Sequence, residues 1–172
     1  MDISVLGKDS IKLKGKNVTF VVNPTKGMPK IAADAVIILD GASDLDLERV
    51  MESRITIEGP GGYEIGGAKI YGTQTPVGTL YKISLDNVSI LLGPAADVEK
   101  EGFNVCQVAI VNTSNNFNES YVTAMEPKIV VLCGDKKVES AKALGAEKTS
   151  LVSKISVTKD KLPEKMEIVV LG

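Results

Sequence analysis

The chain has 172 residues and no histidine, which excludes Ser-His-Asp triads, thiol–imidazole pairs and imidazole-held metals. Its 20 basic and 22 acidic residues leave a net charge of −2, and the only arginines are Arg49 and Arg54. Guanidinium groups dominate base and phosphate recognition, so this balance argues against a dedicated nucleic-acid binder. With 44% hydrophobic residues but only 4% aromatic ones, the chain predicts a folded protein whose core is mainly aliphatic.

Short apolar runs separated by turn residues predict a strand-rich fold. The turn signals Lys14-Gly15-Lys16 and Asp86-Asn87 each predict a hairpin. The glycine cluster at 59–67 predicts a turn in which glycines adopt positive φ. The expected strands lie at residues 3–6, 11–13, 17–22, 35–39, 54–58, 68–71, 79–85, 88–92, 105–111, 128–133 and 167–171.

Three helices are expected among these strands. Residues 44–52 carry apolar side chains at helical spacing, with Asp44 as a candidate cap. Asn118 is placed to cap a helix that runs to about Met125, and a third helix at 135–144 is expected to end at Gly145. Many strands followed by alternating strands and helices predict an α/β fold with two mixed sheets and helices outside.

Several features predict a cytoplasmic protein. The first residues lack the basic and apolar regions of a signal peptide. Apolar runs all fall short of the ~20 residues of a membrane span, so no membrane partner is expected. Cys106 and Cys133 both lie in apolar runs, and they are expected to be buried free thiols in a reducing compartment.

Taken together, these segments resemble the metallo-β-lactamase fold. The opening 3–10 (ISVLGKDS) is similar to the family's strand followed by Leu-Gly-His, and 126–131 (EPKIVV) resembles the strand before its last metal ligand. The segment 59–67 (GPGGYEIGG) is similar to the Gly-Pro-Gly-x-Tyr-Glu-x-Gly-Gly of the small bacterial branch that includes L-ascorbate-6-phosphate lactonases. The resemblance covers nearly the whole chain and implies a single αββα sandwich, reduced in helix content, over residues 1–172.

The same resemblance implies that the family's zinc centre is lost. Its early histidine falls on Lys8, and its remaining ligand positions retain only Asp44. These positions are Asp40, Ala42, Asp44, Leu45, Pro94 and Gly134. One carboxylate cannot hold zinc and leave a coordination site open for water. We therefore expect no zinc, no cofactor and no catalytic residue. We also expect the vacated site to be packed, with Leu45 and Pro94 largely buried and Asp40 and Asp44 facing solvent or backbone N–H groups.

The sequence favours a pseudoenzyme with a non-catalytic binding or assembly role, as a homo-oligomer or with a protein partner. One alternative is a hydrolase or lactonase in which Asp40, Asp44 and Asp135 bind a hard cation such as Mg²⁺, Mn²⁺ or Ca²⁺. A second alternative is weak nucleic-acid binding through the Lys-rich N-terminal hairpin. The polar loop at 112–118 would lie at the rim of the former site and is a further candidate for binding.

Overall fold

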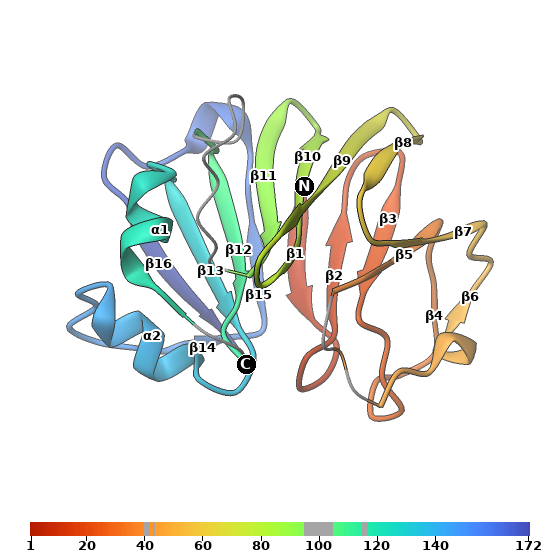
Figure 1. Ribbon diagram of the computed structural model, residues 1–172, viewed down its shortest axis with the longest axis horizontal. Helices are drawn as coiled ribbons and strands as arrows, with labels where there is room; N and C mark the ends of the chain where they lie inside the picture. Colours follow the sequence, from red (N-terminus) through yellow and green to blue (C-terminus); the bar gives the residue numbers. More distant parts are fainter. Residues whose placement is uncertain (40–41, 43, 95–104, 115–116) are drawn as a thin grey trace.

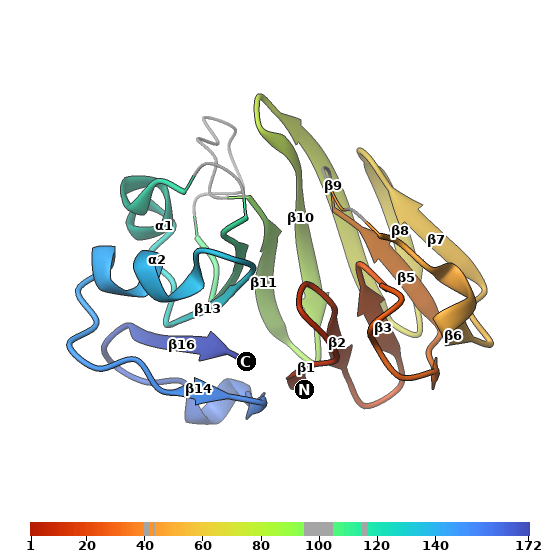
Figure 2. The same ribbon diagram turned by 90° about the horizontal axis from the view of Figure 1, so that it is seen from below.

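The computed structural model describes residues 1–39, 42, 44–94, 105–114 and 117–172. Two β-sheets pack face to face (Figures 1 and 2). The first sheet holds the N-terminal hairpin and the buried strand that follows it. Its six strands are, in spatial order, β15 (Lys154–Ser156), β1 (Asp2–Val5), β2 (Ile11–Lys14), β3 (Thr19–Val22), β5 (Ala35–Ile38) and β7 (Ile55–Glu58).

The second sheet is mixed. From β11 to β16 its strands run parallel, whereas β8 to β11 form an antiparallel meander. The carboxyl ends of β11, β12 and β13 therefore share one edge. The eight strands are, in spatial order, β14 (Leu151–Val152), β16 (Glu167–Leu171), β13 (Ile129–Cys133), β12 (Val108–Asn112), β11 (Val88–Gly93), β10 (Gly78–Leu85), β9 (Ala68–Thr75) and β8 (Gly61–Ile65).

The main core lies between the two sheets, and strand alternation fills it. On β12, Val108 and Ile110 join this core, while Ala109 and Val111 turn to the outer face. The fully buried Phe20 from the first sheet joins the same core as Tyr81 from the second. Side chains of a strand point alternately to opposite faces, so a strand buried on both faces must be apolar throughout.

The two outer faces are covered differently. Helices α1 (Glu119–Ala124) and α2 (Lys137–Ala143) cover the second sheet, where Val122 and Ala141 pack with the outer residues of β13 (Figure 2). The outer face of the first sheet is covered by Met28 and by the short strands β4 (Ile31–Ala32) and β6 (Val50–Met51). The 3₁₀ turns η1 (Leu47–Arg49) and η2 (Lys159–Lys161) complete the elements. None of the helices in the described ranges is both long and apolar enough to cross a membrane.

Several local predictions are confirmed. Asp86 and Asn87 both have positive φ (52° and 63°) in the tight turn between β10 and β11. The Asn118 side chain accepts a hydrogen bond from the Ser120 N–H at 3.0 Å and caps α1. Gly145, with φ of +89°, follows the C-cap of α2, as its place after the helical pattern predicts.

The helix predicted at 44–52 is wrong. Asp46, not Asp44, accepts the capping hydrogen bond of η1, and the chain then enters β6, which pairs with β4. Of the apolar positions, Leu47 and Met51 remain about half exposed (49% and 48%). An amphipathic helix draws most of its stability from burying its apolar face. That burial is missing here, and strand pairing prevails.

The turn predicted at 59–67 is only partly right. Residues of β8 pair with β9 across most of the segment, and the turn is confined to Gly66 and Gly67, whose φ values are +57° and +81°. Glycine has a weak intrinsic preference for strands, so the tertiary pairing with β9 decides the conformation.

Candidate functional site

Loops from both sheets converge around several of the residues that the sequence singled out. Lys8 and Asp9 sit in the turn between β1 and β2, and Asp44 follows the segment after β5. These side chains surround a cavity of about 390 Å³, whose walls are formed by Gly7, Lys8, Asp9, Thr25, Lys26, Gly27 and Asp44. Next to it, Asp135 follows β13 and contacts Lys8. The sheet edge thus gathers several charged groups of both signs.

The strongest contact at the site is an ion pair. Lys8 Nζ lies 3.0 Å from Asp135 Oδ1. The hydrogen bond that the Lys8 ammonium donates to the Asp135 carboxylate raises the pKa of Lys8, and the charges of Asp135, Asp9 and Asp44 act in the same direction. Lys8 therefore stays protonated at neutral pH. Both partners are well exposed, and an exposed pair of this kind contributes little to stability.

Ser114 links the two acidic loops. Its Oγ accepts a hydrogen bond from the Asp135 N–H at 3.3 Å and lies 3.5 Å from Asp9 Oδ1, to which it donates. Its own N–H donates to Asn112 Oδ1 at 2.9 Å. The side chains of Asn112 and Ser114, in the polar loop after β12, are therefore hydrogen-bonded within the protein.

The resemblance matches Gly134 to the family's last histidine, and the surroundings of Gly134 exclude a side chain. Its φ is +94°, a conformation that L-residues rarely adopt. A Cβ atom there would lie 2.6 Å from Ser114 Oγ and 2.9 Å from Asn112 Oδ1. The ligand position is therefore occupied by a hydrogen-bonded loop, and a histidine would not fit without moving it.

The expectation that Leu45 and Pro94 are largely buried is wrong, whereas the expectation that Asp44 faces solvent is confirmed. Leu45 is 37% exposed, and Pro94 is only partly buried. Asp44 has φ of +56° and is exposed, and its carbonyl accepts the Lys26 N–H at 3.4 Å. The α-helix that was expected to bury Leu45 against the sheet does not form. Leu45 instead makes an isolated antiparallel β-bridge with Thr25.

Two more positions that the resemblance matches to family ligands are Ala42 and Asp40. Ala42 is half-buried and packs against the apolar cluster on the outer face of the first sheet. Asp40 lies outside the described residues, so the expected orientation of its side chain and its convergence with Asp44 and Asp135 stay predictions.

The donor set does not suit zinc. Among the described residues, no three His, Cys, Asp or Glu side chains are grouped so that they could hold a metal ion. Asp135, the nearest candidate from the second sheet, is paired with the ammonium group of Lys8. A cation so close to the carboxylates would repel a metal ion. No hydrolytic step through a bound metal is derived for this site.

The two cysteines are buried and free, as the sequence predicts. Burial raises the pKa of Cys106 and of Cys133 to about 12. The Cys133 thiol also donates to the Val111 carbonyl at 3.5 Å. A protonated, buried thiol is neither a nucleophile nor a metal ligand at neutral pH, so both belong to the core.

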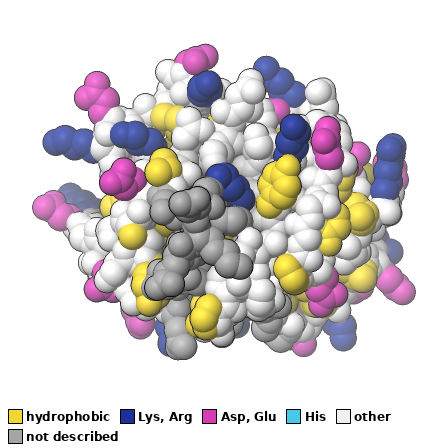
Figure 3. All heavy atoms as spheres, turned by 45° about the horizontal axis from the view of Figure 1, so that its top comes forward, with side chains coloured by type: hydrophobic (Ala, Val, Ile, Leu, Met, Phe, Trp, Pro, Cys, Tyr) yellow, Lys and Arg dark blue, Asp and Glu magenta, His cyan; other side chains and the backbone are white. Residues whose placement is uncertain are grey.

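Charge on the visible surface is mixed. Figure 3 shows lysine or arginine and aspartate or glutamate side chains interspersed over one face, with hydrophobic side chains between them. A continuous field of positive charge, which would attract a phosphate backbone, is not seen on this face.

Two packed sheets with outer helices and a loop-built site at the strand ends define the metallo-β-lactamase fold, and solved structures agree. A protein from Thermotoga maritima assigned to the zinc-dependent hydrolases of the metallo-β-lactamase superfamily superposes with a TM-score of 0.76 at 16% identity, over 99% of this chain and 98% of that one. Human tRNase Z, short form, gives 0.60 at 9% identity, over 92% and 100%. A diphosphatase of the PhnP family gives 0.58 at 10%, over 88% and 85%.

This likeness is one of fold. No family model matches the chain, and no curated protein matches it in sequence. The chain therefore has the metallo-β-lactamase fold, with two mixed sheets and few helices, while the lactonase-like branch has no further support.

Sequence reasoning missed part of the site. It treated Lys8 as a lost histidine, did not single out Asp9, and included Ser114 only as part of the polar loop at 112–118. The partnership of Lys8 with Asp135 joins residues that are far apart in sequence and from different sheets, so only the tertiary fold reveals it. A local signal was present in the adjacent Lys8 and Asp9, which place opposite charges in one tight turn.

Proposed function

We propose that this chain is a pseudoenzyme of the metallo-β-lactamase fold, with a non-catalytic binding or assembly role in the cytoplasm. The observation that carries the proposal is the Lys8–Asp135 ion pair beside Gly134. A protonated amine stands at the position that the resemblance matches to the family's early histidine, and the loop beside Gly134 leaves no room for an imidazole. Two free buried cysteines are consistent with a reducing compartment.

The same features separate this role from its alternatives. A hard-metal hydrolase would need Asp44 to act with Asp40 and Asp135, and Lys8 already neutralises Asp135. Weak nucleic-acid binding through the N-terminal lysines draws on exposed Lys14 and Lys16, but negative charge is interspersed with positive on the face seen in Figure 3. Salt-dependent binding to nucleic acid would favour that alternative.

Metal content and turnover test the proposal together. Purified protein is dialysed separately against Zn²⁺, Mn²⁺ and Mg²⁺, its metal content is measured, and its melting temperature is recorded with and without a strong chelator. We expect metal well below one equivalent, no change of melting temperature, and no turnover of phosphodiester, lactone or β-lactam substrates.

A matched pair of variants identifies the source of any activity. Asp44→Ala removes the retained ligand, and Asp160→Ala removes an exposed carboxylate of η2. Metal-dependent turnover that Asp44→Ala abolishes and Asp160→Ala leaves intact would overturn the pseudoenzyme and establish the hard-metal hydrolase.

A further inference from the structure

Strand β7 forms one edge of the first sheet in the described part of the chain. It pairs with β5 in parallel, with Thr56 opposite Val36. The Asn23 N–H donates to the Ile37 carbonyl, so Ile37 directs its backbone groups toward β3. By the alternation of parallel ladders, the backbone groups of Thr56 and Glu58 are then at the free edge. Such an edge is a template for a further strand.

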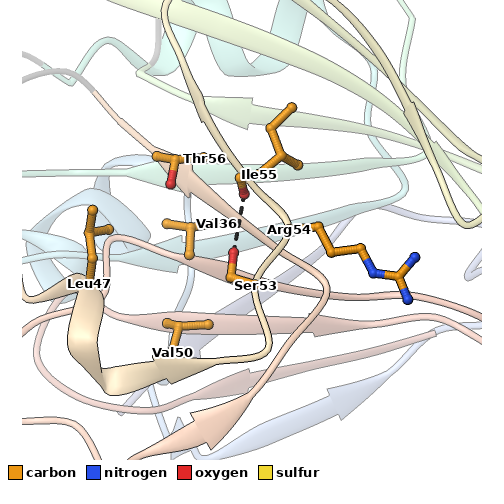
Figure 4. Close-up of a pocket in the computed structure, with 7 residues that line it drawn as sticks. All are labelled: Val36, Leu47, Val50, Ser53, Arg54, Ile55 and Thr56. Atoms are coloured by element: carbon orange, nitrogen blue, oxygen red, sulfur yellow. Dashed lines mark hydrogen bonds between the residues drawn. The ribbon is translucent and has the colours of Figure 1, made fainter.

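Apolar side chains are exposed beside this edge, next to the polar residues Ser53, Arg54 and Thr56. Leu47 and Met51 are about half exposed, and Ile55 is 37% exposed. A hollow of about 280 Å³ lies between η1 and the strands β5 and β7. Figure 4 shows Val36, Leu47 and Val50 around this hollow. Large apolar side chains gathered at an unpaired edge indicate an interaction surface.

Charges on β7 and on the residue just before it favour a second copy as the occupant. Arg54 and Glu58 lie two residues on either side of Thr56, and both are exposed. Neither forms an ion pair with another described residue. If two β7 strands pair antiparallel about a two-fold axis at Thr56, Arg54 of each copy lies opposite Glu58 of the other. Opposite charges across a strand pair stabilise it, and like charges destabilise it.

Neighbouring registers are less favourable. The outward backbone groups of Thr56 and Glu58 set the pairing, so the register changes in steps that keep this parity. The Arg54 N–H already donates to the Asp34 carbonyl at 3.0 Å, so the contact of Arg54 with Glu58 of the other copy is one between side chains. One alternative sets Glu52 opposite Glu58 of the other copy, and the other sets Thr56 opposite Glu58 and leaves Arg54 without its partner. The charge pattern thus selects the register centred on Thr56.

The geometry points to a homodimer in which two β7 strands pair antiparallel about Thr56. The pairing joins two six-stranded sheets into one and places the hollow of each copy on the same face of the joined sheet. This inference rests on the assembly role proposed above and names its partner as a second copy of this chain. A closed two-fold contact of this kind uses the same patch on both copies.

Sedimentation velocity over a concentration series tests the dimer. The 172-residue chain should reach twice its 18.2 kDa mass. Arg54→Glu and Glu58→Arg alone each place like charges opposite each other twice and should raise the dissociation constant about tenfold or more. The double variant carrying both changes restores opposite charges and should return the constant to near the wild-type value.

Two controls separate pairing from misfolding. Glu64→Arg makes the same charge change on β8, the edge strand of the other sheet, and should leave the dissociation constant unchanged. Thr56→Pro removes a backbone N–H at the centre of the edge. It should give a monomer with unchanged far-UV circular dichroism, since proline is tolerated on edge strands.

A wild-type protein that stays monomeric at every concentration overturns the inference. So does a dimer that neither single charge change weakens, or one that the double variant fails to restore. The metal and turnover assays on the same variants report on the pseudoenzyme separately, so failure of the dimer and failure of the proposed function can be told apart.

Discussion

Replacing Gly134 by alanine tests whether the surrounding loop excludes a side chain at this position. An L-residue in a left-handed conformation costs about 1–2 kcal/mol, and φ here is +94°. The new Cβ would also lie 2.6 Å from Ser114 Oγ, and overpacking of this kind costs about 1–3 kcal/mol. Together these terms predict that the free energy of unfolding falls by about 2–5 kcal/mol.

Urea unfolding monitored by circular dichroism and tyrosine fluorescence measures this loss, since the chain has four tyrosines and no tryptophan. With an m-value of about 2 kcal/mol/M, the midpoint should fall by about 1–2.5 M.

Two other glycines supply matched controls. Gly145 has φ of +89° but open space around it, so Gly145→Ala should cost only the backbone term of about 1–2 kcal/mol. Gly27 has open space and no positive φ, so Gly27→Ala should be neutral or stabilising by about 0.4–1 kcal/mol. If Gly134→Ala loses no more stability than Gly145→Ala, the close contacts with Ser114 carry no energy, and the claim that no side chain fits there is refuted.

Two further outcomes are expected. Burial raises the pKa of Cys106 and Cys133 to about 12, while unfolded thiols titrate near pH ~8.5. The two thiols therefore leave the free energy of unfolding unchanged below pH ~8.5. Above that pH the unfolded thiols lose their protons, and the free energy of unfolding falls by about 1.4 kcal/mol per pH unit for each thiol. Urea midpoints between pH 8 and 10 should show this slope, and replacing both cysteines by alanine should remove it; an unchanged slope would contradict the assignment. In the turn between β10 and β11, Asn87 has φ of 63°. Thermal melts should show Asn87→Gly at least as stable as the wild type and Asn87→Val less stable by about 1–2 kcal/mol; equal melting temperatures for the two variants would count against this turn.

Local chemistry explains which elements were predictable. Strand β5 reads as apolar throughout because both of its faces are buried. The α1 cap at Asn118 and the turn at Asp86 and Asn87 depend on side chains and φ values only a few residues apart. Elements of this kind carry their own signal, so the sequence predicted them correctly.

Elements that depend on a distant partner were not predictable. Strand β8 is glycine-rich and becomes a strand through its pairing with β9, while η1 and β6 replace a predicted helix because β4 pairs with β6. In both cases the decisive hydrogen bonds come from another part of the chain. A local pattern cannot weigh such contacts against its own preference.

The candidate site divides in the same way. The sequence alone determined that the chain has no imidazole and that, of the matched zinc ligands, only Asp44 is retained, because these facts concern residue identity. Only the tertiary structure decided that Lys8 pairs with Asp135 and that Ser114 fills the space beside Gly134. These contacts join loops from two sheets, and their geometry exists only once the sheets have packed face to face.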